Sequence, residues 1–141
     1  MKTYQALAQE LELGHIVTFT GHLENPFPAM GALNAFALLS TAHEGVSQAI
    51  LQAAYLGIPL IATPTGGLAE VCIHEETGLQ VLPHNPSAVA QAVLRLKRDA
   101  TLAHRLGAAA RGLVSSRFTF EQTLSGMEAV YQKLLESSRP L

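Results

Sequence analysis

The chain has 141 residues, of which 48% are hydrophobic and 14% are charged, and its formal net charge at pH 7 is −2. This length and composition predict one folded domain with a substantial core and argue against intrinsic disorder. The small negative charge gives no general attraction to nucleic acid or to an anionic membrane surface. Cys72 is the single cysteine, so no internal disulfide forms, and its apolar neighbours Val71 and Ile73 indicate a buried thiol in a reducing compartment.

The N-terminal part of the chain is predicted to hold a helix, a strand and a loop. Residues 4–13 carry apolar side chains at helical spacing and stop at Gly14. Residues 15–20, HIVTFT, have the composition of a strand. A loop at 21–26 precedes a short helix in which Pro28 suits the first turn. The opening segment is amphipathic and contains acids, unlike a signal peptide or a membrane span, so we expect a cytoplasmic location.

The middle of the chain alternates short apolar strands with helices. Strands are expected at 36–39, 59–63 and 79–82, and helices at 46–56 and 68–73. The first of these helices has Ile50 and Ala53 on one side and ends at Gly57, a typical helix-terminating residue. Strands that alternate with helices predict a parallel sheet covered on both faces.

The C-terminal part is predicted to be helical. Asn85 and Pro86 form an N-cap and first-turn pair for a helix that ends near residue 96. A second helix is expected at 101–115. Thr119 and Gln122 match a capping box for the last helix. That helix places apolar side chains on one face, at Phe120, Leu124, Met127, Tyr131 and Leu134.

Two loops that follow predicted strands concentrate polar residues and glycine. Glu44 and Gly45 follow strand 36–39, and Thr65-Gly66-Gly67 follows strand 59–63. In an open α/β sheet, loops that leave the carboxyl ends of the strands form the ligand crevice. We therefore expect both loops to open into one crevice.

Residues 36–67 carry an ordered series of motifs: Glu44-Gly45, Gln52, Gly57-Ile58-Pro59 and Thr63-Pro64-Thr65-Gly66-Gly67. This series resembles the donor-binding half of retaining glycosyltransferases with two Rossmann-like domains, the glycosyl transferases group 1 family. That family has two glutamates separated by seven residues, then a G-x-P strand and a T-x-x-GG turn. The likeness continues through Glu70-Val71, Glu76-Thr77-Gly78-Leu79, Arg105-Leu106-Gly107 and Arg117-Phe118. The chain departs from the pattern at the second glutamate, which is Gln52.

The resemblance implies a Rossmann-like α/β domain, residues 1–141, that is truncated to about four strands. The family domain has strand order 3-2-1-4-5-6, and this chain would hold strands three to six. The first strands, a loop with Arg and Lys that faces the donor phosphates, and the N-terminal acceptor domain would be missing. Two arrangements then complete the sheet: HIVTFT pairs directly with strand 36–39, which we favour, or a second chain covers the exposed edge in a homodimer.

The resemblance also implies roles for single residues. Glu44 would be the catalytic-site residue that faces the donor sugar. Of the two roles proposed for this glutamate in the family, nucleophile or positioning and electrostatic support, we favour the second. The amides of Gly45, Val46 and Ser47 would bind phosphate at a helix N-terminus. Gln52 would bond the ribose hydroxyls more weakly than a carboxylate.

Simpler interpretations remain open for each of these residues. Glu44 suits a solvated acid near a helix end, Ser47 a plain N-cap, and Gln52 an exposed helix glutamine. Thr65-Gly66-Gly67 suits either a close backbone approach to a ligand or a purely structural turn.

The resemblance places Gly21 and His22 near the nucleobase, and His43 is the other histidine in a crevice loop. A lone histidine is more often a surface residue. The histidines show no ligand spacing, so no metal is expected. No Lys or Arg occurs between residues 3 and 94, which leaves helix N-termini, backbone amides and histidines as phosphate partners in that block.

The implied function is binding of a UDP- or GDP-sugar donor for transfer with retention, with no metal or other cofactor and no nucleic-acid partner. The chain alone is expected to be inactive. In the full-length enzyme, the expected location is the cytoplasm or the periphery of the inner membrane. The alternatives are a non-catalytic nucleotide-binding or partner module of the same fold, and a general nucleotide-binding domain without preference for sugar nucleotides.

Overall fold

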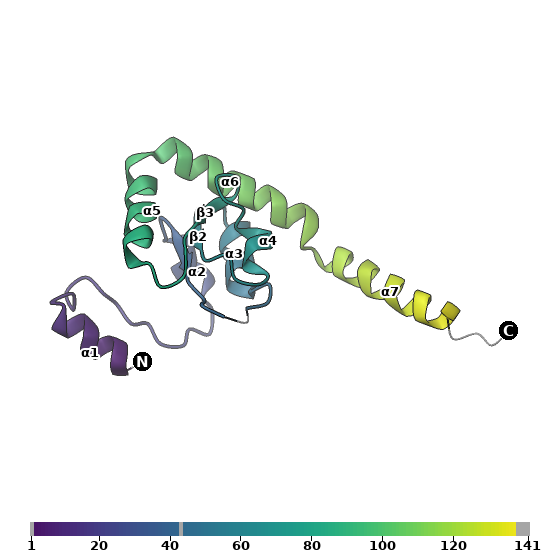
Figure 1. Ribbon diagram of the computed structural model, residues 1–141, viewed down its shortest axis with the longest axis horizontal. Helices are drawn as coiled ribbons and strands as arrows, with labels where there is room; N and C mark the ends of the chain where they lie inside the picture. The colour runs from purple at the N-terminus through teal and green to yellow at the C-terminus, as the bar shows by residue number, and fades with distance from the viewer. Residues whose placement is uncertain (1, 43, 138–141) are drawn as a thin grey trace.

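A computed structural model describes residues 2–42 and 44–137 (Figure 1). Three short strands form one parallel sheet: β1 (Phe36–Leu38), β2 (Leu60–Ala62) and β3 (Gly78–Gln80). Strand β2 is central, and its register pairs Leu60 with Phe36 on one side and with Gly78 on the other. The predicted Rossmann-like parallel sheet is confirmed, with three strands where about four were expected.

Seven helices accompany the sheet in the described residues: α1 (Lys2–Glu10), α2 (Phe27–Gly31), α3 (Gln48–Tyr55), α4 (Leu68–Val71), α5 (Pro86–Arg98), α6 (Ala100–Arg117) and α7 (Phe120–Ser137). Two N-caps follow the sequence pattern. Asn85 accepts a hydrogen bond from the Ala88 amide at 3.0 Å, and Thr119 accepts one from the Gln122 amide at 3.2 Å. These bonds satisfy amides that have no partner inside their helices.

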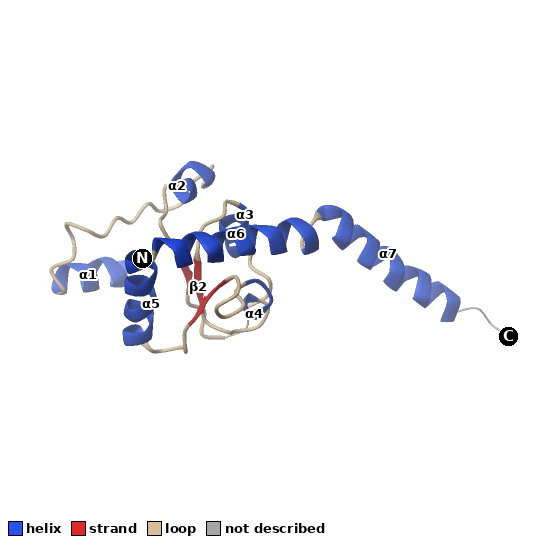
Figure 2. Cartoon of the chain, turned by 90° about the horizontal axis from the view of Figure 1, so that it is seen from above, coloured by secondary structure: helices blue, strands red, loops and turns tan. Residues whose placement is uncertain are grey.

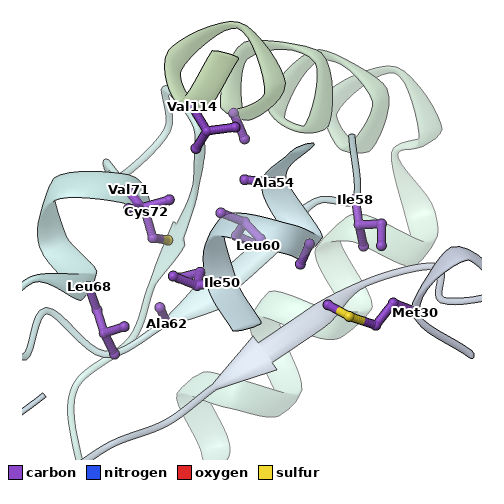
Figure 3. Close-up of a cluster of buried hydrophobic side chains, with 12 residues drawn as sticks. Met30, Ile50, Ala54, Ile58, Leu60, Ala62, Leu68, Val71, Cys72 and Val114 are labelled. Carbon is purple, nitrogen blue, oxygen red and sulfur yellow. The ribbon is translucent and has the colours of Figure 1, made fainter. Parts of the chain in front are cut away.

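Helices cover both faces of the sheet. Neighbouring residues of β2 point to opposite sides, and the side chains on both sides are apolar and buried. Leu60 and Ala62 join a cluster with side chains of α3, α4 and the second half of α6 (Figure 3). Ile61 joins a second cluster with side chains of β3, α5 and the first half of α6. The sheet is therefore the middle layer of a three-layer domain. Cys72 lies in the first cluster with no exposed surface, and burial raises its pKa to about 11, which confirms the predicted buried thiol.

The strand predicted at 15–20 is absent, so the expected direct pairing of HIVTFT with β1 is wrong. These residues form a turn and irregular chain, all exposed. The 15 residues between them and β1 contain one five-residue helix, α2, whereas a parallel crossover usually needs a dozen or more residues with a helix packed on the sheet. Residues 2–25 extend away from the sheet in Figure 1, and no described strand lies beside the outer edge of β1.

The C-terminal helix α7 projects from the body of the domain (Figures 1 and 2). None of its described residues is buried. Its apolar face is exposed along its whole length, from Phe120, which is 76% exposed, to Leu135, which is 71% exposed. No described helix combines the length and apolar character needed to cross a membrane.

Candidate functional site

The two glycine-containing loops are in direct contact at the carboxyl ends of β1 and β2. The Gly67 amide donates a hydrogen bond to the Glu44 carbonyl at 3.0 Å. A Cβ atom on Gly67 would lie 2.5 Å from the amide nitrogen of Val46. Only glycine allows backbones to approach this closely. The structure thus brings Glu44, Gly45 and Val46 together with Thr65, Gly66 and Gly67.

The Glu44 side chain is half-buried and held by a hydrogen bond. The Ser40 hydroxyl donates to the Glu44 carboxylate oxygen Oε2 at 2.5 Å. The Ser40 carbonyl in turn accepts hydrogen bonds from the hydroxyls of Thr63 at 2.5 Å and Thr65 at 3.0 Å. This geometry differs from that of a freely solvated acid. The sequence pattern does not indicate either Ser40 or Thr63 as a side-chain partner of the site.

Helix α3 begins at Gln48, two residues later than predicted, so Val46 and Ser47 precede the helix. The reason is the loop contact, which engages the Val46 backbone with Gly67. Ser47 occupies the N-cap with φ −70° and ψ 131°, but its hydroxyl makes no capping bond. The first amides of α3 therefore have no side-chain cap, and the helix dipole adds partial positive charge there. This end of the helix suits an anion.

Gln52 lies one turn beyond Gln48 on α3 and lines an open pocket of about 570 Å³. Val46 and Arg117 line the same pocket, together with Tyr55 and Phe118. Arg117 brings a cation beside a helix that has no Lys or Arg of its own. Arg117 is far from Gln52 in the sequence, so this proximity was not predicted. The only sequence feature that marked Arg117 was the Arg117-Phe118 pair in the family likeness.

Gly21 and His22 lie in the exposed segment between α1 and α2. Gly21 has φ +66°, and a Cβ atom there would meet no atom within 4 Å. Because the strand at 15–20 is absent, this pair does not end a strand. Within the described part of the chain, no hydrogen bond joins either residue to the Glu44 loop or the Gly66 loop. Their nucleobase role stays a prediction, and His43 lies outside the described residues.

Metal ligands are not clustered in the described parts of the chain. Within residues 2–42 and 44–137, no group of three or more His, Cys, Asp and Glu side chains is placed to hold a metal ion. The polar groups at this edge of the sheet are instead hydroxyls, backbone amides and one carboxylate.

Comparison with known proteins gives a family and a fold. The family model described as "Glycosyl transferases group 1" matches residues 1–113. The N-acetyl-alpha-D-glucosaminyl L-malate synthase of Bacillus anthracis is 28% identical over 137 residues, which are 97% of this chain and 36% of that protein. The GDP-mannose-dependent alpha-(1-6)-phosphatidylinositol monomannoside mannosyltransferase of Mycobacterium tuberculosis (strain H37Rv) is 33% identical over 129 residues, 86% of this chain and 34% of that protein.

Solved structures match along almost the whole chain. Sucrose-phosphate synthase from Thermosynechococcus elongatus superposes with a TM-score of 0.87 and 32% identity, over 97% of this chain and 35% of that one. HepE from Anabaena, solved in complex with UDP, superposes with a TM-score of 0.88 and 23% identity, over 94% of this chain and 36% of that one, which shows a shared fold. The chain thus spans about a third of the length of these relatives.

Proposed function

Because the chain belongs to the glycosyl transferases group 1 family, we propose that it binds the nucleotide-sugar donor of a retaining glycosyltransferase. The observation that carries the proposal is the contact between the Glu44 and Gly67 loops at the uncapped N-terminus of α3. It gathers a carboxylate, helix amides without a side-chain cap from Ser47, and close-packed backbone at the edge of the sheet where ligands of α/β domains bind.

The sugar, the phosphates and the ribose of a nucleoside diphosphate sugar each have a partner of suitable chemistry. The Glu44 carboxylate accepts hydrogen bonds from sugar hydroxyls. The amides at the start of α3 receive the phosphates, and the charge that develops on the departing diphosphate is stabilised by the same dipole. Gln52 bonds the ribose through its amide, in a pocket that also holds Arg117. No metal enters the proposal.

The relatives support the proposed donor class. The mycobacterial relative is named for its dependence on GDP-mannose, and the Anabaena protein was solved with UDP and with UDP-glucose. A UDP- or GDP-sugar is therefore the proposed ligand. The relatives are about three times as long as this chain, and we assign acceptor binding to that remaining length. A cytoplasmic location, with peripheral attachment to the inner membrane in the full-length enzyme, belongs to the same proposal.

Two further features bear on how the domain works. No described strand pairs with the outer edge of β1, and a homodimer through this edge is the proposed arrangement for the chain on its own. Gln52 in place of a glutamate supports a second candidate function, a non-catalytic nucleotide-binding or partner module of the same fold. That module would bind the nucleotide without turnover even when joined to an acceptor domain.

A ligand titration tests the proposal. Amide NMR spectra of the chain are recorded with UDP, GDP, UDP-glucose, GDP-mannose and ATP, for the wild type and for Glu44→Ala. We expect shifts around residues 44–52 with at least one sugar nucleotide, at dissociation constants of roughly millimolar, and weaker sugar-nucleotide binding in Glu44→Ala. Equal affinity for ATP would indicate a general nucleotide-binding domain, and no shift with any compound would overturn the proposal.

A further inference from the structure

Ser40 connects the candidate sugar-binding carboxylate to the central strand of the sheet. Ser40 lies just beyond the end of β1, and its hydroxyl donates its single hydrogen to Glu44 Oε2 at 2.5 Å. A hydrogen bond to an ionised carboxylate is stronger than one between neutral groups. Among the described residues, no hydrogen bond occupies the other carboxylate oxygen, Oε1, which leaves that oxygen for a ligand.

The backbone of Ser40 is itself fixed from the next strand. Thr63 is 2% exposed, and its hydroxyl donates to the Ser40 carbonyl at 2.5 Å. Thr65 donates a second hydroxyl bond to the same carbonyl at 3.0 Å. Two donors on one carbonyl leave Ser40 little freedom to move relative to β2.

The same loop after β2 holds both ends of the segment from Ser40 to Glu44. Thr63 and Thr65 bond the Ser40 carbonyl, and the Gly67 amide bonds the Glu44 carbonyl at 3.0 Å. Between these anchors, the bond from Ser40 to Glu44 fixes the carboxylate. Ordering a glutamate side chain costs rotamer entropy, and a carboxylate ordered before binding avoids that cost when the ligand arrives.

We propose that Ser40 is a positioning residue: its hydroxyl orients the Glu44 carboxylate so that one oxygen stays available to hydroxyl groups of the donor sugar. This proposal rests on the proposed function for its ligand, whereas the orientation of Glu44 is a property of the chain alone. Ser40 therefore influences affinity for the sugar and not for the nucleotide.

The orientation is measured without any ligand. Protein labelled with ¹³C-glutamate is prepared as wild type, Ser40→Ala, Ser40→Thr and Thr41→Ala, and the Glu44 carboxyl signal is assigned with Glu44→Gln. We expect the Glu44 carboxyl signal to move in Ser40→Ala, while the Gly67 amide signal stays in place and Ser40→Thr keeps the wild-type carboxyl signal. Thr41→Ala, a change at the exposed neighbouring residue, should leave both signals unmoved.

The ligand arm compares UDP-glucose with UDP on the same four proteins. Without Ser40 the Glu44 side chain must be immobilised when the sugar binds, and this cost predicts about three- to tenfold weaker UDP-glucose binding in Ser40→Ala with UDP binding unchanged, and recovery in Ser40→Thr. Equal weakening of both ligands, or an unmoved Glu44 signal in Ser40→Ala, would overturn the role of Ser40. If the wild type binds neither this pair nor GDP and GDP-mannose, the proposed function fails, and the carboxyl signal still decides whether Ser40 orients Glu44.

Discussion

Gly66 packs directly against the carbonyl group of Glu44. A Cβ atom on Gly66 would lie 1.9 Å from the Glu44 carbonyl oxygen, and the residue has φ +53°, a conformation that side chains rarely adopt. Space and backbone conformation therefore both require glycine here. The glycine of the T-x-x-GG motif is thus explained by contact between two loops of the protein itself, whatever further approach to a ligand it permits.

Gly66→Ala is expected to lower the free energy of unfolding by about 2–4 kcal/mol, because the new methyl group clashes with backbone and the residue is strained. Urea denaturation measures the change. Gly31→Ala is the matched control, since a Cβ atom at Gly31 meets nothing within 4 Å, and its effect should stay within about 0.5 kcal/mol. Equal stability of the two variants would show that the loops are not in contact.

Helix α6 contains two glycines with opposite expected responses to alanine. A Cβ atom on Gly107 would lie 2.0 Å from the Gly57 carbonyl oxygen, whereas one on Gly112 would meet nothing within 4 Å. Gly107→Ala should destabilise the domain by about 2–4 kcal/mol, because α6 must move off the end of α3. Gly112→Ala should stabilise it by about 0.5–1 kcal/mol through higher helix propensity. The same sign for both substitutions, measured by thermal unfolding, would argue against this packing.

Glu75 and Arg95 make stability depend on pH. Arg95 donates two hydrogen bonds to the Glu75 carboxylate, and chiefly for this reason the pKa of Glu75 lies below its ordinary value of 4.5. A lowered pKa in the folded state stabilises the protein above the unfolded pKa, and this stabilisation is lost as the pH falls through the folded pKa. The wild type should therefore be more stable than Glu75→Gln at pH 7, and the difference should close as the pH falls below 4.5.

The effect is small because both side chains are exposed to solvent. Repeating the comparison in an Arg95→Gln background isolates the pair, since Glu75→Gln should then have no pH-dependent effect from this bond. A pH-dependent difference that survives in that background would assign it to another group.

The sequence predicted those parts of the fold that depend on local patterns. The three strands of the sheet, the cap at Asn85 and the end of the helix at Gly57 follow from periodicity and from residues with restricted conformations. The prediction of a strand at 15–20 was wrong, because a strand also needs a neighbouring strand to pair with, and strand composition alone does not supply one. The start of α3 was misplaced because the loop contact with Gly67 lies outside any local pattern.

The candidate site also has parts that the sequence predicts and parts that it does not. Glycines and an acid after neighbouring strands pointed to the loop contact, since the ends of parallel strands must meet at one edge. Ser40 contributes a single hydroxyl bond to Glu44, and Arg117 lines the pocket of Gln52 from a distant part of the sequence. Neither contact produces a periodic sequence pattern from which it could be predicted. The prediction for Gly21 and His22 assumed a strand at 15–20 that does not form, so their role beside the nucleobase stays a prediction.

The 141-residue chain alone should transfer no sugar. Residues 3–94, which include the start of α3, contain no Lys or Arg and leave Arg117 as the cation that lines the α3 pocket. This limits stabilisation of the departing diphosphate, and the acceptor site is proposed to lie outside this chain. The measurement is release of UDP or GDP from the corresponding sugar nucleotides in the presence and absence of added sugars. Nucleotide release in proportion to protein, lost in Glu44→Ala, would contradict this expectation.

Gln52 and Gln48 line the same pocket one helical turn apart, so the same substitution at each gives a directional test of how a nucleotide lies on α3. Gln52→Glu should bind UDP about three- to tenfold more tightly than the wild type, because a carboxylate makes stronger hydrogen bonds to ribose hydroxyls than an amide does. Gln48→Glu should bind UDP more weakly, because its carboxylate is added at the helix N-terminus where the phosphates are proposed to sit.

Uridine, which has the ribose but no phosphate, separates the two effects. Gln52→Glu should strengthen uridine binding as well as UDP binding, while Gln48→Glu should weaken UDP binding and leave uridine unaffected. Calorimetry or NMR titration of both ligands on the wild type and the two variants provides the comparison. A reversed pattern, in which Gln48→Glu strengthens uridine binding and Gln52→Glu selectively weakens UDP, would mean that the nucleotide lies along α3 in the opposite direction.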